Sequence, residues 1–272
     1  MGRIVGGFAT SHVLFPPTGV EDKATRVIDG MLEMRARIRA LSPDVIVLAA
    51  SDHLNNFSLA MQVTLAVGVA DEFTTLGDSG APAVTFQGMR DFAEGFVRFA
   101  GGREFDLVQV EEARPDHGMA IPRLVIDPKN EFRIVPVYIN CNMPVPPSPS
   151  RCYRLGGALK DYVESERPAG ERAVVVGAGG LSHWLCLPEQ GKVAADFDEA
   201  FIDKMISGRA EELARLTTHE IELASGNGGL EATAWLFVAG ALPAARGDKL
   251  YYEPIPEWIS GMGGVSLSPA AA

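Results

Sequence analysis

Three apolar stretches of this chain each lead directly to a histidine. The stretches and the histidines that follow them are 3–10 with His12, 44–50 with His53, and 173–180 with His183. Apolar, β-branched runs of this length are typical of strands buried on both faces of a parallel sheet. The carboxyl ends of such strands form the ligand-binding crevice of open α/β sheets, so the pattern predicts three imidazoles at one edge of one sheet. They would form a metal or acid–base site there, unless they are hydrogen-bonded core histidines that end strands by chance.

Helical periodicity separates the predicted strands. Residues 24–38 repeat apolar side chains at helical spacing, and Ser42-Pro43 ends this helix before the second strand. Further helices are expected at 92–99, 153–163, 196–216 and 230–241, and further strands at 61–69, 107–110 and 133–139. This alternation predicts an α/β fold with a central, mostly parallel or mixed sheet flanked by helices. No repeat or boundary divides the chain, so residues 1–272 are expected to form a single domain. The proline- and glycine-rich tail after Tyr251 carries no clear element.

Composition excludes several classes of partner. The formal net charge of −11 and the pI of about 5.0 disfavour binding to nucleic acid or to an anionic membrane. The three cysteines have no CxxC spacing, which fits a reducing compartment. The longest apolar run, 232–245, is shorter than the ~20 residues that a membrane-spanning helix needs. We therefore expect a cytoplasmic protein with neither a nucleic-acid nor a membrane partner.

Glu231 is an unusual residue for its position. It lies in the first turn of the apolar helix predicted at 230–241, after the glycine-rich turn at 225–229. A carboxylate is rarely buried unless it is paired or binds a metal, although it can also simply complement a helix N-terminus. With His12 and His53 it would complete the two-histidine, one-carboxylate set of non-haem Fe(II) oxygenases. The same set also binds catalytic zinc, and sequence spacing does not separate the two metals.

The remaining histidines divide into candidates for proton transfer and surface residues. His183 follows Gly179-Gly180, where a ligand can approach the backbone, and a histidine there suits general acid–base catalysis. His117 lies in an Asp-His-Gly turn, where a catalytic role and a surface role are both open. The glycine cluster before Ser182 lacks the last glycine of the dinucleotide fingerprint, which argues against a nicotinamide or flavin site.

Short motifs around these residues occur in a fixed order along almost the whole chain. They are Ser11-His12, Ser51-Asp52-His53, Pro115-Asp116-His117-Gly118, Val135-Pro136-Val137, Gly179-Gly180-Leu181-Ser182-His183, and Asn227-Gly228-Gly229-Leu230-Glu231 followed by Trp235. In this order they resemble the class III extradiol ring-cleavage dioxygenases, typified by the β subunit of protocatechuate 4,5-dioxygenase.

The resemblance implies a fold, an activity and a site. It implies one α/β domain in which His12, His53 and Glu231 bind Fe(II), His183 is the acid–base residue, and His117 is a second histidine in the pocket. The enzyme would use O2 to open the ring of a catechol-type substrate, either an ortho-diphenol or an aminophenol, incorporating both oxygen atoms. The sequence does not choose between a catechol, a gallate-like triol, a catecholic acid and an aminophenol.

Two other functions and two assemblies stay open at this point. The same three ligands on the same scaffold could serve a zinc- or manganese-dependent hydrolase, or the chain could be a non-catalytic subunit or binding protein. Some members of the resembled family carry a small partner subunit. We expect a homo-oligomer here, with a small partner subunit as the alternative.

Overall fold

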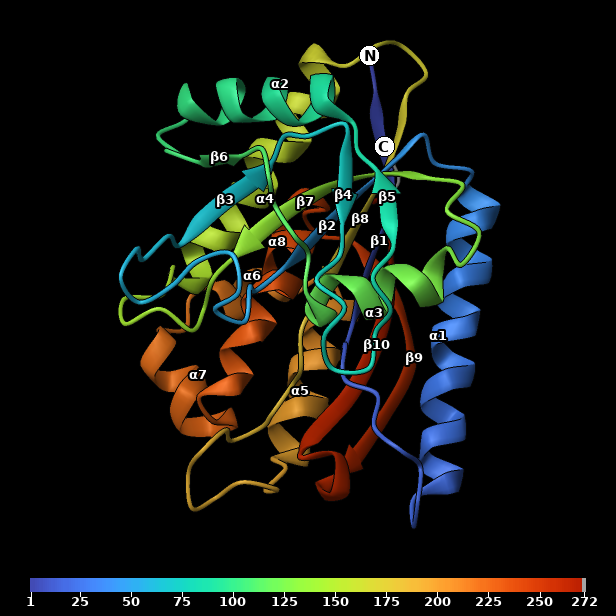
Figure 1. The fold of residues 1–272 in the computed structure, drawn as a ribbon, viewed down its shortest axis with the longest axis vertical. Helices are drawn as coiled ribbons and strands as arrows, with labels where there is room; N and C mark the ends of the chain where they lie inside the picture. The colour runs from blue at the N-terminus through green and yellow to red at the C-terminus, as the bar shows by residue number, and fades with distance from the viewer. Residues whose placement is uncertain (271–272) are drawn as a thin grey trace.

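An eight-stranded mixed sheet forms the centre of the molecule (Figure 1). The computed structural model describes residues 1–270. The strands of this sheet are β1 (Arg3–Thr10), β2 (Val45–Ala50), β3 (Leu65–Gly68), β6 (Val108–Val110), β7 (Arg133–Ile139), β8 (Arg172–Ala178), β9 (Arg246–Ile255) and β10 (Ser260–Ser268). They lie in the order β6-β3-β7-β2-β8-β1-β10-β9, and β4 (Glu72–Thr74) pairs separately with β5 (Thr85–Gln87).

Helices cover the two faces of the sheet. They are α1 (Glu21–Leu41), α2 (Arg90–Gly101), α3 (His117–Ile126), α4 (Pro149–Glu166), α5 (Ala195–Ile206), α6 (Ala210–Ala214), α7 (Thr218–Ser225) and α8 (Thr233–Ala241), with 3-10 turns η1 (Gly228–Ala232) and η2 (Pro256–Trp258). None of the helices described in residues 1–270 is long and apolar enough to cross a membrane.

The parallel centre of the sheet confirms the α/β prediction. β7, β2, β8 and β1 are neighbours and run parallel to one another. β2 and β1 therefore lie on either side of β8, and Gly177 of β8 is in register with both Ala49 and Ala9. As a result, the three strands that lead to His53, His183 and His12 end side by side.

Alternating side chains of the central strands build two separate cores. In β2, Val45, Val47 and Ala49 face the core that includes residues of α2, α4 and α8, whereas Ile46 and Leu48 face the core that includes residues of α1 and α3. Every residue of β2 is buried. Burial on both faces explains why the strand is a continuous apolar run rather than an alternation of apolar and polar residues.

The C-terminal tail differs from its prediction. The sequence indicated no clear element after Tyr251, but β9 and β10 form an antiparallel pair, and β10 joins the sheet antiparallel to β1. The glycines of β10 permit close packing: a Cβ at Gly264 would lie 2.2 Å from the ring of Tyr251. The glycines that leave the tail without a sequence pattern therefore make room for side chains of other segments.

The helix predicted at 196–216 is also wrong in its length. The structure divides this segment into α5 and α6, with Gly208 between them at a φ of +79°. A residue with a side chain rarely adopts this left-handed conformation, so the glycine allows the chain to turn there. The shorter α5 packs on β9 and β10, with Phe201 and Met205 buried.

A buried arginine anchors the end of α3, the helix that begins with His117. The Arg123 guanidinium is 1% exposed and lies 2.8 Å from the Asp127 carboxylate. It also donates to the carbonyl of Phe132, just before β7. The segment Asp116-His117-Gly118 is predicted as a turn, but Asp116 caps the start of α3 by accepting from the Gly118 N–H.

Candidate metal centre

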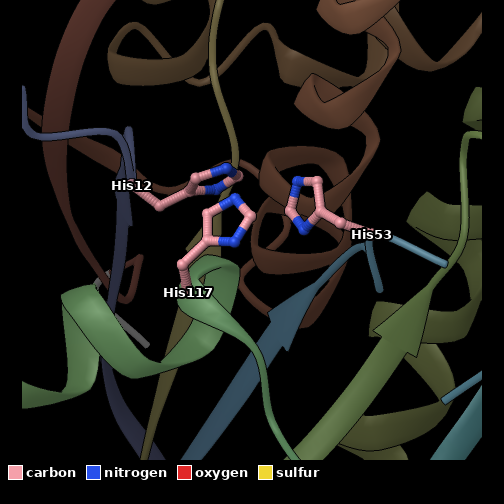
Figure 2. A group of neighbouring side chains, drawn as sticks. All are labelled: His12, His53 and His117. Carbon is pink, nitrogen blue, oxygen red and sulfur yellow. The ribbon is translucent and has the colours of Figure 1, made fainter. Parts of the chain in front are cut away.

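Three histidine side chains meet where β1 and β2 end (Figure 2). His12 follows β1, His53 follows β2, and His117 is the first residue of α3. The ring centroids lie 5.1 Å apart for His12 and His53, 5.5 Å for His12 and His117, and 4.1 Å for His53 and His117. One ring nitrogen of each histidine lies within 4.8 Å of the others, so one metal ion could contact all three.

Glu231 reaches the same point from a distant part of the chain. Its Oε1 lies 3.2 Å from His53 Nε2, and its Oε2 lies 3.7 Å from His12 Nε2. The Gly180 N–H donates to Oε2 at 2.7 Å and fixes the carboxylate. A Cβ at Gly179 would lie 2.8 Å from the Cβ of Glu231, so a glycine is needed where η1 crosses the end of β8.

The structure refines the expected setting of Glu231. The sequence indicated the first turn of an apolar α-helix, but Glu231 lies in the 3-10 turn η1, and α8 begins after it. The side chain is 6% exposed, and the only basic groups within its ion-pair distance among the described residues are the two histidines. A carboxylate this buried needs such partners or a cation.

These donors fit a divalent metal ion. Imidazole and carboxylate are ligands of Fe, Zn and Mn. The Nδ1 atom of His12 is buried and has no hydrogen-bond partner among residues 1–270. Its Nε2 atom makes no hydrogen bond within that range either, since it lies 3.7 Å from Glu231 Oε2. A buried imidazole without a hydrogen-bond partner is costly, and coordination through one ring nitrogen would offset part of that cost.

The charges of the site are set for binding a cation. Burial lowers the pKa of His12 to about 4, so its ring is neutral, the form that binds metals. Burial raises the pKa of Glu231, but the neighbouring histidines lower it more, so it stays well below its usual range and the carboxylate is ionised. Burial lowers the pKa of His53, while Asp116 and Glu231 raise it more, to about 10. Metal binding at His53 would therefore release a proton.

Asp116 orients His53, a role that the sequence did not reveal. Its Oδ2 accepts from the backbone N–H of His53 at 2.7 Å and lies 3.1 Å from His53 Nδ1. Its Oδ1 accepts from the Gly118 N–H, which ties the start of α3 to His53. A hydrogen on Nδ1 leaves Nε2 free for a metal, as in other carboxylate–histidine–metal arrangements. The only sequence signal was an acidic residue directly before His117.

We expect Asp116→Asn to weaken metal binding by roughly 10–100-fold, because an amide holds the His53 tautomer less firmly than a carboxylate. Competition with a chelator under anaerobic conditions measures this affinity. Asp203→Asn, which changes an exposed carboxylate on α5, serves as the matched control and should bind metal like the wild type. Unchanged affinity in Asp116→Asn would contradict the orienting role.

His117 is held by a second carboxylate. Its Nδ1 lies 2.5 Å from Asp78 Oδ2, and its backbone N–H donates to Asp78 Oδ1 at 2.9 Å. Asp78 lies in the segment between β4 and β5. The ring points toward His12 and His53 in Figure 2, with Nδ1 engaged by Asp78 and Nε2 left for the site.

His183 lies beside the turn that carries Glu231, outside the three-histidine cluster. Its Nδ1 is 3.0 Å from the carbonyl oxygen of Leu181, which can only accept, so Nδ1 carries the hydrogen. The other ring nitrogen, Nε2, is packed against Gly228 of η1, where a Cβ would lie only 2.1 Å away. His219, the fifth histidine of the sequence, lies on α7 and is exposed.

A network that the sequence did not reveal supports the backbone at His183. The Asp198 carboxylate accepts from the N–H and hydroxyl of Ser182 at 2.9 and 2.7 Å, and from the Tyr252 hydroxyl at 2.9 Å. Burial raises the pKa of Asp198 to about 6, against the lowering effect of these hydrogen bonds. Ser182, which ruled out a dinucleotide fingerprint, therefore serves to position its neighbour.

A cavity of about 370 Å³ opens beside the cluster, with His53 and Glu231 in its wall. The rest of the wall comes from the segment after β7, from residues 227–230, and from Ser51, Leu185 and Glu222. Ligand pockets span roughly 300–1,000 Å³, so this cavity is sized for a small molecule such as one substituted ring.

Comparison with known proteins decides the family. Residues 7–263 match the family model of the catalytic LigB subunit of aromatic ring-opening dioxygenase. The chain belongs to this LigB family. It is 27% identical over 303 residues to 2,3-dihydroxyphenylpropionate/2,3-dihydroxicinnamic acid 1,2-dioxygenase of Escherichia coli O81 (strain ED1a), and 26% identical to that of strain K12. Each comparison covers 92% of this chain and 95% of the relative.

A solved structure supports the fold of this LigB-family protein. The crystal structure of uncharacterized protein JW3007 from Escherichia coli K12 superposes with a TM-score of 0.61, covering 97% of this chain and 100% of that one. The sequence identity of 14% limits this likeness to the fold.

Family membership confirms the predicted activity: this LigB-family protein is an extradiol ring-cleaving dioxygenase of catechol-type substrates. Dioxygenases of the family depend on a metal, and the histidine cluster described above could bind one.

Proposed function

We propose that this LigB-family dioxygenase uses Fe(II), held by His12, His53 and Glu231. The supporting observation is that the Glu231 carboxylate reaches Nε2 of both histidines, at 3.7 and 3.2 Å, from the opposite end of the chain. Two histidines and a carboxylate on one side of an Fe(II) ion leave positions open for substrate and O2. When bound, the metal would lower the pKa of a catechol hydroxyl and serve as the template for both reactants.

His183 would act as the general base and acid. Its Nδ1 hydrogen is engaged by Leu181, so a neutral ring presents the lone pair of Nε2. It could take a proton from a substrate hydroxyl and later return it to an oxygen of the opening ring. Gly228 lets the ring lie directly against η1, beside Glu231.

His117 would be the second histidine in the substrate pocket. Asp78 holds its Nδ1, so Nε2 can exchange a hydrogen bond with a reactant. His117 is also a third imidazole within reach of the metal, which makes His12, His53 and His117 the competing donor set. The carboxylate set is favoured because Glu231 is buried and ionised and lies 3.2 Å from His53 Nε2. A buried negative charge of this kind needs a cation beside it.

Metal reconstitution tests the proposal directly. Protein purified without metal is loaded anaerobically with Fe(II), Zn(II) or Mn(II), and O2 uptake is measured over a panel of ortho-diphenols and aminophenols. We expect Fe(II) alone to support O2 uptake with formation of a ring-opened product. O2 uptake supported by Mn(II) or Zn(II) and not by Fe(II) would overturn the assignment of iron.

The assembly and the location stay predictions. We propose a homo-oligomer, with a small partner subunit as the alternative, and a cytoplasmic protein whose residues 1–272 form one catalytic domain. The substrate and O2 are the partners that the family activity requires.

A further inference from the structure

The cavity beside His53 and Glu231 has an unusual charge. Among the described residues that line it, Glu222 is the only carboxylate besides Glu231. None of these residues is a lysine or an arginine. Glu222 is exposed on α7. Its side chain makes no hydrogen bond or ion pair within residues 1–270, so no cation neutralises it.

The amides of the wall are already partly engaged. The Asn227 amide accepts from the Leu185 N–H at 2.8 Å and donates one N–H to the Leu185 carbonyl at 3.0 Å. Asn142 donates one N–H to the Asp52 carbonyl at 2.8 Å. Each amide keeps one N–H, a neutral donor without the charge of a lysine or an arginine. The other contributions come largely from apolar side chains, including Met143 and Leu230.

We infer that the substrate is a catechol whose ring substituent in this cavity is uncharged, and that carboxylated catechols are excluded. The inference rests on the proposed function. A carboxylate substituent on this wall would lose water and would gain neither a lysine nor an arginine as a partner, which costs free energy. It would also lie near Glu222, whose charge no ion pair neutralises, and like charges repel. The relatives named for phenylpropionate and cinnamic acid act on carboxylated molecules, so this chain would differ from them in substrate.

A matched pair of substrates tests the inference. 3-(2,3-Dihydroxyphenyl)propionate and its primary amide have nearly the same shape but differ by one charge. With the Fe(II)-loaded protein at neutral pH, we expect kcat/KM for the amide to exceed that for the acid by at least about tenfold, mainly through KM. Anaerobic calorimetry should give the same order of affinities without turnover.

A variant of Glu222 separates its charge from the rest of the wall. Glu222→Gln should reduce the amide-to-acid ratio several-fold, and added salt should reduce the ratio of the wild type because the carboxylate is exposed. Glu166→Gln, which removes an exposed charge at the end of α4, is the control and should leave the ratio unchanged.

The outcomes keep the two proposals apart. Cleavage of the acid as efficiently as the amide overturns the inference and leaves the proposed function intact. A ratio unaffected by Glu222→Gln overturns the role given to Glu222. No O2 uptake with unsubstituted catechol, the acid or the amide overturns the proposed function itself.

Discussion

Glu231→Ala should bind Fe(II) more than about 100-fold more weakly than the wild type and lose ring cleavage. Loss of an outer partner of a metal ligand costs about 10–100-fold in affinity, and loss of a ligand should cost more. The substitution also removes the negative charge that offsets the cation among buried histidines. Anaerobic Fe(II) titration against a chelator gives the affinity, and O2 uptake gives the activity.

His117→Ala is the matched variant because His117 is the other candidate for the third ligand. If His12, His53 and Glu231 hold the metal, His117→Ala keeps Fe(II) near the wild-type affinity and loses turnover only. Glu231→Gln preserves the shape of the side chain and its contact with Gly180, so circular dichroism of this variant separates a folding defect from ligand loss. Metal loss in His117→Ala with retention in Glu231→Ala would assign the three-histidine set instead.

His183→Ala should retain Fe(II) and lower kcat by about 10²–10⁴-fold, the contribution expected of one general acid–base residue. The reason is geometric: Leu181 fixes the hydrogen on Nδ1, and the ring lies against the turn of Glu231 without belonging to the metal cluster. Metal content is measured by elemental analysis, and kcat from O2 uptake at saturating substrate.

Two further variants support this second test. His219→Ala removes an exposed histidine from α7 and should turn over like the wild type. His183→Gln fills the space next to Gly228 but does not titrate near neutral pH, so it should be as slow as His183→Ala. Wild-type turnover in either His183 variant is incompatible with the acid–base role.

Local sequence patterns identified the central strands of the sheet because burial on both faces gives these strands a continuous apolar sequence. β2 and β8 are continuous apolar runs, and a strand covered on both faces has no other signature. The C-terminal pair was missed for the opposite reason. β10 forms by pairing with the distant strand β1, from Gly7 with Leu267 to Thr10 with Gly264. Its glycines admit side chains from other segments, and Gly264 packs against the ring of Tyr251.

Sequence periodicity missed the helix boundaries that a single residue or cap decides. The 196–216 periodicity continues across Gly208, but the positive φ of this residue ends the helix. The Asp-His-Gly segment has the composition of a turn, yet Asp116 caps a helix there. In both cases the backbone conformation, rather than the apolar pattern, sets the boundary.

By itself, the sequence determined which chemical groups this protein carries to the ends of its strands. His12, His53 and His183 follow apolar runs, and local apolar composition is enough to identify a strand that is buried on both faces. The tertiary structure decided which groups meet. It brought Glu231 to His53 through the close approach of η1 at Gly179, and it gave His53 and His117 the carboxylates of Asp116 and Asp78. It also left the adjoining cavity without a lysine or an arginine among the described residues that line it. These features depend on contacts between distant segments, and loop closure between distant segments leaves no periodic trace in the sequence.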